Sequence, residues 1–185
     1  KDYYGEHCND NTKPYAGVVE LIETLKKKGY AVAIVSNKID FAVKELNDLY
    51  FKGIVPVAIG EKEGIRRKPA PDTVFEALKE LGKTKEEAVY VGDSDVDIET
   101  AKNAGMPCIS VLWGFRDKEF LAEHGAEYYA ETADDVLRYI KEMKYLQSKG
   151  INYSFVKNIQ EVTTYKYKKT PELFLALVSF YIEDK

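Results

Sequence analysis

The stretch Val89-Tyr90-Val91-Gly92-Asp93-Ser94-Asp95-Val96-Asp97 decides the fold class of this 185-residue chain. A short apolar run that leads into glycine and several carboxylates is typical of a parallel strand whose carboxyl end carries a functional site. Carboxylates packed closely repel one another, so a hard cation is their natural neutraliser, and oxygen ligands favour Mg²⁺. The alternative is an acidic turn that caps a helix beginning near Asp97.

A calcium-binding EF-hand loop is excluded at the same stretch. Counting from Asp93, the sixth position is Ile98 where the loop requires glycine, and the twelfth is Ala104 where it requires glutamate.

Strand-length apolar runs alternate with helical patterns on both sides of this stretch. Val18, Leu21, Ile22 and Leu25 form one helical stripe, and the continuous apolar run at 31–35 follows it. Such alternation predicts an α/β fold with a Rossmann-like, doubly wound parallel sheet. We expect strands at 31–35, 54–59, 88–91, 107–112 and 127–130, and helices at 17–28, 39–49, 71–81, 97–104, 118–124 and 133–146.

Two further polar elements follow predicted strands. Ser36 and Asn37 come directly after the run at 31–35, where a hydroxyl and backbone N–H groups at a helix start would form a phosphate cradle. The alternative is an ordinary helix N-cap. In the segment Arg66-Arg67-Lys68-Pro69-Ala70-Pro71-Asp72, two prolines stiffen the loop, so that Lys68 can sit as a point charge against a phosphate. The alternative there is a solvated basic turn.

Taken together and in this order, the three elements resemble the second, third and fourth motifs of the haloacid dehalogenase superfamily. Similarity to its phosphoglycolate phosphatase branch extends over roughly residues 3–142, including Pro14-Tyr15-Ala16-Gly17 and Trp113-Gly114-Phe115-Arg116. The resemblance implies a phosphatase that transfers phosphate to an aspartate and hydrolyses the aspartyl-phosphate with water.

The resemblance also implies a role for each matching residue. Ser36 would hydrogen-bond the transferring phosphoryl group with help from the backbone at Asn37, and Lys68 would neutralise phosphate charge and orient the nucleophile. Asp93 would bind Mg²⁺ directly, and Asp97 would support the metal or its waters. We therefore expect Ser36 and Lys68 as catalytic residues, Ser36, Asn37 and Lys68 as phosphate-binding residues, and Asp93 and Asp97 as metal residues.

One part of the family pattern does not occur in this chain. The first motif, a buried strand ending in Asp-x-Asp-Gly-Thr, supplies the nucleophile in the family, and no such segment is found here. Residues 1–15 resemble the remnant of a helical cap and linker, and 16–146 a phosphatase core without its first strand. Strands 31–35 and 88–91 should each lose a neighbour in the sheet. The exposed edges would associate with a missing N-terminal segment or a partner chain, or the tail would cover them.

The tail after residue 146 does not match the family. We expect 147–185 to form a small C-terminal appendage, with a hairpin at 151–168 and an apolar helix over Leu173–Ile182. Such a helix must be buried against something, and the gap between strands 31–35 and 88–91 is one hypothesis for its place.

Composition excludes several other classes of protein. Hydrophobic residues make up 45% and charged residues 31%, which is an ordinary globular balance, and the formal net charge of −4 argues against nucleic acid as a partner. Two cysteines cannot build a disulfide framework, and no apolar run is long enough to span a membrane, so we expect a cytoplasmic protein.

The function expected from the resemblance is Mg²⁺-dependent hydrolysis of a small phosphorylated metabolite such as 2-phosphoglycolate, with the nucleophile outside this chain. A pyrophosphatase or sugar-phosphate phosphatase is the near alternative, because the cap selects the substrate. A non-catalytic module that binds phosphate, metal or a partner is another alternative, and one half of a split enzyme is a third. The chain by itself is expected to be inactive.

Overall fold

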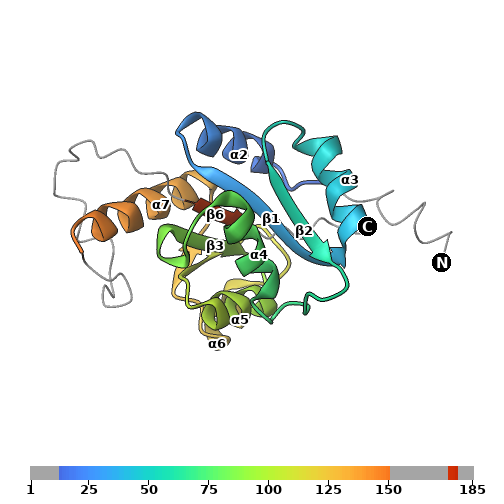
Figure 1. Ribbon diagram of the computed structural model, residues 1–185. Coiled ribbons are helices and arrows are strands. Elements are labelled where there is room, and N and C mark those ends of the chain that lie inside the picture. The colour runs from blue at the N-terminus through green and yellow to red at the C-terminus, as the bar shows by residue number, and fades with distance from the viewer. Residues whose placement is uncertain (1–12, 151–174, 179–185) are drawn as a thin grey trace.

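The computed structural model describes residues 13–150 and 175–178, and it shows an open α/β fold with a single parallel sheet (Figure 1). The strand order is β2-β1-β6-β3-β4-β5, and every neighbouring pair is parallel. The expected fold class is therefore confirmed. The strands are β1 (Ala31–Ile39), β2 (Val57–Glu61), β3 (Ala88–Gly92), β4 (Cys108–Val111), β5 (Tyr128–Ala130) and β6 (Leu175–Val178).

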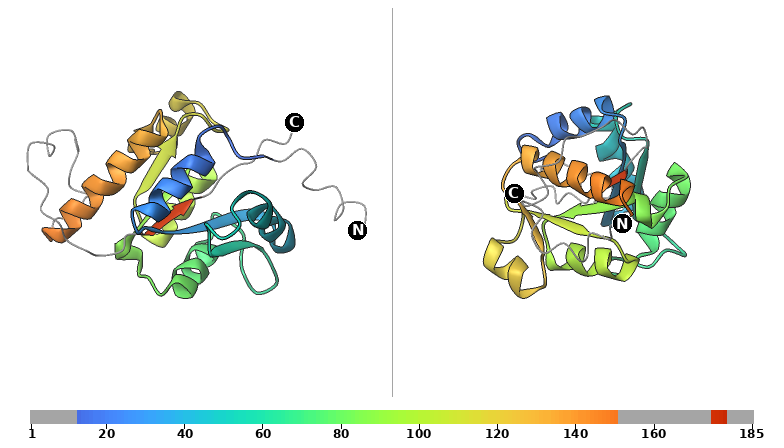
Figure 2. Two further views of the ribbon diagram at one scale, coloured as in Figure 1. Left: turned by 90° about the horizontal axis from the view of Figure 1, so that it is seen from above. Right: turned by 90° about the vertical axis from the view of Figure 1, so that its left-hand side faces the viewer.

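Helices cover both faces of this sheet, as a doubly wound fold requires (Figure 2). One face carries α2 (Val18–Lys27), α3 (Asp40–Tyr50) and α7 (Ala133–Ser148), and the other carries α4 (Asp72–Leu81) and α5 (Asp95–Ala104). The short helix α6 (Lys118–Glu123) lies between β4 and β5 in the sequence. No helix in the described ranges combines the length and the apolar character needed to cross a bilayer.

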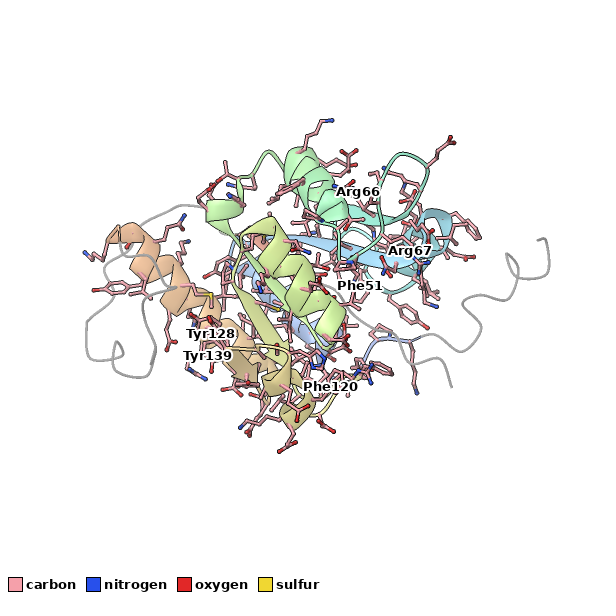
Figure 3. All side chains as sticks on the ribbon, turned by 90° about the horizontal axis from the view of Figure 1, so that it is seen from below. Phe51, Arg66, Arg67, Phe120, Tyr128 and Tyr139 are labelled. Atoms are coloured by element: carbon pink, nitrogen blue, oxygen red, sulfur yellow. The ribbon has the colours of Figure 1, made fainter. Side chains whose placement is uncertain are left out.

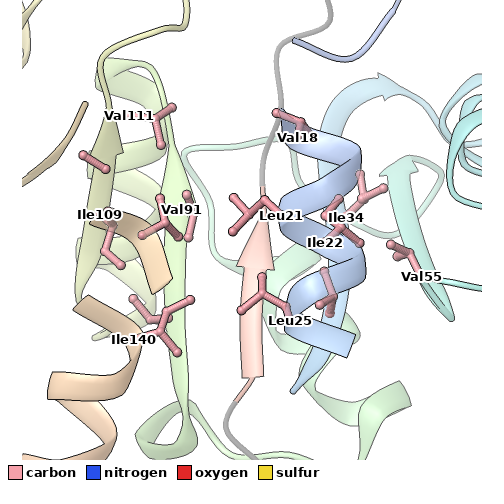
Figure 4. Packing of buried hydrophobic residues seen from close by; sticks show 14 of the residues in the cluster. Val18, Leu21, Ile22, Leu25, Ile34, Val55, Val91, Ile109, Val111 and Ile140 are labelled. Atoms are coloured by element: carbon pink, nitrogen blue, oxygen red, sulfur yellow. The ribbon is translucent and has the colours of Figure 1, made fainter. Parts of the chain in front are cut away.

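Two apolar cores hold these layers together. Leu21 and Leu25 of α2, Val91 of β3 and Ile140 of α7 belong to the larger core, which extends on both sides of β6 (Figure 4). On the opposite face, Val74 of α4 packs with residues of α5 and the central strands. Because both faces are buried, the central strands read as continuous apolar runs and not as alternating ones.

The C-terminal strand β6 is the main departure from expectation. Residues 175–178 form a strand, whereas the sequence pattern predicted a helix over this stretch. A short run that is apolar all round does not separate a buried helix from a strand buried on both faces, and here the tertiary context decides. The other residues of the expected hairpin and helix lie outside the described residues.

The place of β6 agrees with the hypothesis that the tail fills the gap in the sheet. Leu175 pairs with Ala31 of β1 and with Ala88 of β3, and Val178 pairs with Ile34 and Val91. Within the described residues, the facing edges of β1 and β3 are thus both paired with β6. The two halves of the sheet, β2-β1 and β3-β4-β5, are joined through this one strand.

Candidate active site at the carboxyl ends of β1 and β3

The residues singled out in the sequence gather at one edge of the sheet. Ser36 and Asn37 belong to the last part of β1, and Asp93 follows β3 directly. Asp97 lies in the first turn of α5, and Lys68 comes from the loop between β2 and α4. Hydrogen bonds connect Asn37 to Lys68, Lys68 to Asp97, and Asp97 to the backbone of Asp93. These bonds bring Asn37, Lys68, Asp93 and Asp97 together, as expected where the carboxyl ends of parallel strands meet. Ser36 is placed at this edge by its position in β1 alone.

Asp93 presents a buried carboxylate with one oxygen in need of a partner. The residue is only 1% exposed, and its Oδ2 atom accepts a hydrogen bond of 3.0 Å from the backbone N–H of Phe115. Oδ1 is buried and has no hydrogen-bond partner among the described residues. Burial first, and then the negative charge of Asp97, raise the pKa of the Asp93 carboxyl to about 7. A cation bound at Oδ1 would offset both the cost of burying the charged carboxylate and its repulsion by Asp97.

Glycine at position 114 permits the close approach of the loop after β4 to Asp93. A Cβ atom at this position would lie 2.2 Å from the Cβ of Asp93, which is far inside van der Waals contact. Gly92 is required in the same way, because a Cβ there would lie 2.4 Å from the Cβ of Asp97. The two glycines therefore allow the carboxylates to be packed against backbone.

Asp97 organises the site through both carboxylate oxygens. Oδ1 accepts from the Lys68 ammonium at 2.8 Å and from the Tyr90 hydroxyl at 3.0 Å. Oδ2 accepts from the Ser94 hydroxyl at 2.7 Å and from the backbone N–H of Asp93 at 3.2 Å. These four bonds tie Lys68, Tyr90, Ser94 and the backbone of Asp93 to one buried carboxylate. Support of a metal or its waters by Asp97 stays a prediction.

Ser94 shows that the capping alternative for the acidic turn also holds. It is the N-cap of α5, and its hydroxyl oxygen accepts a hydrogen bond of 3.3 Å from the backbone N–H of Asp97. The helix begins at Asp95, two residues before the expected start. The turn thus caps a helix and gathers carboxylates at the same time.

Lys68 is buried, and its ammonium lies inside the protein and not in solvent. Its side chain is 3% exposed and forms an ion pair with the fully buried Asp97. The alternative of a solvated basic turn is therefore wrong for Lys68. It holds for the two preceding residues, because Arg66 pairs with Asp72 at 2.8 Å and Arg67 with Glu61 at 3.3 Å on the surface of the same loop (Figure 3).

Ser36 and Asn37 are parts of a strand and do not cap a helix. The strand β1 continues to Ile39, and α3 begins only at Asp40 without a side-chain cap. The Ser36 hydroxyl oxygen accepts a hydrogen bond of 3.1 Å from the backbone N–H of Lys38. Ser36 also lines a narrow, mostly apolar cavity beside Val43 and Phe51. The backbone at Asn37 is thus not part of a helix N-terminus, which corrects that part of the expected cradle.

Sequence reasoning did not identify Tyr90 as a site residue. Its ring is completely buried between β3 and the helices α4 and α5, while its hydroxyl reaches Asp97 and Lys68. In the sequence it reads only as one more apolar residue of a buried strand. The one signal available was a hydroxyl in such a strand, which needs a polar partner.

The donor set at this edge fits a hard cation in part. The unpartnered Oδ1 of Asp93 supplies one buried, charged oxygen ligand of the kind that Mg²⁺ prefers. Within residues 13–150 and 175–178, no group of three or more histidine, cysteine, aspartate or glutamate side chains could hold a metal ion. Mg²⁺ commonly keeps several waters and takes only one or two carboxylates, so Asp93 with Asp97 behind it is compatible with such a site.

Comparison with known proteins agrees with this geometry. The haloacid dehalogenase-like hydrolase family matches residues 1–111. The phosphoglycolate phosphatase of Aquifex aeolicus is 37% identical over 116 residues, which are 62% of this chain and 54% of that protein. The pyrophosphatase PpaX of Listeria welshimeri is 32% identical over 143 residues, which are 77% of this chain and 66% of that protein.

A solved structure shares the fold as well. The crystal structure of a protein from Lactobacillus delbrueckii subsp. bulgaricus, assigned as a phosphoglycolate phosphatase, has 45% sequence identity and a TM-score of 0.72. The match covers 75% of this chain and 58% of that one. The chain thus spans between about half and two thirds of the length of these relatives. By motif order, fold and family match, it belongs to the haloacid dehalogenase-like hydrolases.

Proposed function

We propose that this chain is the phosphate- and metal-binding part of a Mg²⁺-dependent phosphatase that acts in the cytoplasm on a small phosphomonoester such as 2-phosphoglycolate. The observation that carries the proposal is the buried network of Lys68, Asp97 and Asp93, in which one Asp93 oxygen has no hydrogen-bond partner within residues 13–150 and 175–178. A buried ammonium beside a buried, unsatisfied carboxylate is suited to a phosphoryl group and its cation.

The chain's own residues would act by binding and orienting the phosphoryl group. Lys68 would place its positive charge against the phosphoryl oxygens, where charge in the transition state must be stabilised. The Ser36 hydroxyl would hydrogen-bond the same group from the end of β1. Asp93 would bind Mg²⁺ directly and Asp97 would support the metal or its waters, and the bound ion would supply charge neutralisation for the phosphate.

The nucleophilic carboxylate is proposed to come from sequence outside these 185 residues. The strand between β1 and β3 is β6, and its four residues Leu175–Val178 contain no carboxylate. We therefore expect no turnover from this chain alone, and the aspartyl-phosphate would form only when a segment with a suitably placed aspartate is present.

Turnover assays test the proposal directly. Hydrolysis of p-nitrophenyl phosphate with Mg²⁺ should be absent for the 185-residue chain and present for a version extended by the upstream coding sequence. Asp93→Asn should abolish turnover in the extended version. Equal turnover by the short chain would contradict the assignment of the missing nucleophile, and no turnover by either version would contradict the enzymatic proposal.

A substrate panel separates the two enzymatic alternatives. The PpaX relative supports the pyrophosphatase alternative, because it matches a larger share of this chain, whereas the phosphoglycolate phosphatase is more similar in sequence, with 37% against 32% identity. Values of kcat/KM for 2-phosphoglycolate, inorganic pyrophosphate and a hexose phosphate in the extended protein would rank these substrates. We expect 2-phosphoglycolate to be preferred.

The occupied sheet position favours one non-enzymatic alternative. Because β6 fills the place between the two site-bearing strands, the alternative is a module that binds phosphate or metal without turnover. Titration calorimetry of the short chain with inorganic phosphate in the presence of Mg²⁺ tests this alternative. Binding without turnover in the extended version would support the module.

A further inference from the structure

The Lys68 ammonium has a defined position that its own flexible side chain cannot provide. A lysine ammonium sits on a flexible four-carbon stem, so a defined position requires that both the backbone and the charged end be fixed. Lys68 comes from the β2–α4 loop, outside any helix or strand. Nevertheless its Nζ atom lies 2.8 Å from Oδ1 of Asp97, inside the protein.

Asn37 fixes the backbone of Lys68 from the neighbouring strand. Its Oδ1 accepts a hydrogen bond of 2.8 Å from the Lys68 backbone N–H, and its Nδ2 donates one of 3.0 Å to the Lys68 carbonyl oxygen. These two bonds engage the peptide groups on both sides of the Lys68 Cα. They therefore set the direction in which its side chain leaves the loop.

Tyr90 fixes the other end. Its hydroxyl donates to Oδ1 of Asp97 at 3.0 Å and accepts from Nζ of Lys68 at 3.4 Å, so that it bridges the two members of the ion pair. The ring is fully buried, which leaves the hydroxyl little freedom to move. A planar, packed side chain thus determines where the ammonium and the carboxylate meet.

We infer that Asn37 and Tyr90 are positioning residues that together hold Lys68, Asn37 through its backbone and Tyr90 through its ammonium. Asn37 would then serve the site through its side chain, in addition to the backbone role expected for it. We call these contacts of Asn37 and Tyr90 with Lys68 the clamp. That Lys68 in turn binds phosphate rests on the proposed function, but the clamp itself can be tested without turnover.

Chemical access to Lys68 tests the clamp in the 185-residue chain. The protein is treated with N-acetoxysuccinimide, and acetylation of Lys68 relative to Lys83 is measured by mass spectrometry. Loss of one or two hydrogen bonds should raise this ratio by about fivefold or more in Asn37→Ala and in Tyr90→Phe. General loosening of the fold would raise acetylation of both lysines and leave the ratio unchanged.

Asn103→Ala is the matched control. Asn103 donates a hydrogen bond of 2.9 Å to the carbonyl oxygen of Pro69, so it also ties the loop to the body of the protein, but this bond is made to the residue after Lys68 and not to Lys68 itself. Its removal should leave the acetylation ratio within about twofold of the wild type, because the Lys68 clamp stays in place. An equal rise in Asn103→Ala would show that any tie on the loop suffices, and would overturn the inference.

Kinetics in the upstream-extended protein provide the second readout. Asn37→Ala and Tyr90→Phe should lower kcat by about 10- to 100-fold with little change in KM, because a displaced ammonium affects the transition state more than substrate binding. An unchanged acetylation ratio in both variants would overturn the inference. If Asn37→Ala does not fold, Tyr90→Phe, which keeps the buried ring, decides alone. Absence of turnover in the wild type would contradict the proposed function and leave the acetylation result to decide the clamp.

Discussion

Asp93 is expected to bind a cation, and for this its carboxyl group must be ionised. Its burial beside the carboxylate of Asp97 favours the protonated form instead. Its pKa of about 7 lies above the ordinary 3.8, so the folded protein binds a proton at Asp93 more tightly than the unfolded chain does. Without a cation, the contribution of Asp93 to the stability of the fold should therefore fall as the pH rises from about 4 to 7. Above about pH 7 the folded protein carries the full cost of the ionised, buried Asp93.

Asp93→Asn removes this penalty and should stabilise the metal-free protein at pH 8 by on the order of 2–4 kcal/mol, with the difference vanishing near pH 4. Mg²⁺ should stabilise the wild type and not the variant, since only the carboxylate is a good ligand. Thermal unfolding of both proteins in EDTA and in Mg²⁺, at pH 4 and at pH 8, measures the stability difference between variant and wild type under each of these four conditions. A wild type that is the more stable of the two at pH 8 in EDTA would contradict the assigned pKa shift.

The site also shows what could be read at the residue scale from the sequence. The order of Ser36, Lys68 and Asp93 along the chain predicted one edge of one sheet, because the carboxyl ends of parallel strands meet there. Tyr90 was not predicted, since its role depends on contacts with Lys68 and Asp97, of which only the second lies nearby in the sequence. Sequence patterns report burial, and they do not report which buried hydroxyl finds which partner.

At the scale of an element, α7 contains a carboxyl that the proposed activity does not use. Glu142 is buried, and in the part of the chain that the structure describes neither of its carboxylate oxygens has a hydrogen-bond partner. Arg138 places a positive charge beside it, with Nη1 at 3.6 Å from Oε2. Burial raises the pKa of Glu142 above its ordinary value, and Arg138 opposes this only in part.

Glu142→Gln should therefore stabilise the protein at neutral pH by on the order of 1 kcal/mol, because it removes the charge and keeps the shape. In the wild type, the raised pKa means that the contribution of Glu142 to stability is most favourable below the ordinary pKa of 4.5 and is lost as the pH rises through the folded-state value. Urea unfolding at pH 5 and pH 8 measures both effects. Glu80→Gln, at an exposed position of α4, is the control and should change little. A destabilised Glu142→Gln would show that the carboxylate has a favourable role.

Helix and strand boundaries were predictable where the local pattern agrees with the tertiary context. The stripe of α2 and the apolar runs of β1 and β3 appear in the structure close to where the pattern placed them. The stretch that forms β6 was misassigned, because four apolar residues in a row carry no period of their own. Their strand conformation depends on pairing with the edges of β1 and β3, which lie far away in the sequence.

For the whole molecule, β6 is the strand on which the sheet depends. It is last in the sequence and central in space, and it bonds to β1 on one side and to β3 on the other. Without it, the β2-β1 and β3-β4-β5 halves would each present an unpaired edge toward the other, inside a protein whose cores lie on both faces. Unpaired buried backbone groups are unfavourable, and exposed strand edges promote association.

Leu177→Pro tests this dependence, because proline removes a backbone N–H and is hardly tolerated in a central strand. We expect a loss of about 3 kcal/mol or more, which for a chain of this size is a fall in Tm of roughly 10 °C, together with a shift to higher oligomers in size-exclusion chromatography. Ala133→Pro is the matched control, since Ala133 is the first residue of α7, a position that proline suits. If Leu177→Pro unfolded at the same temperature as Ala133→Pro and stayed in the same oligomeric state, the two half-sheets would have to be held together by the helices alone, and β6 would not be the strand that completes the sheet.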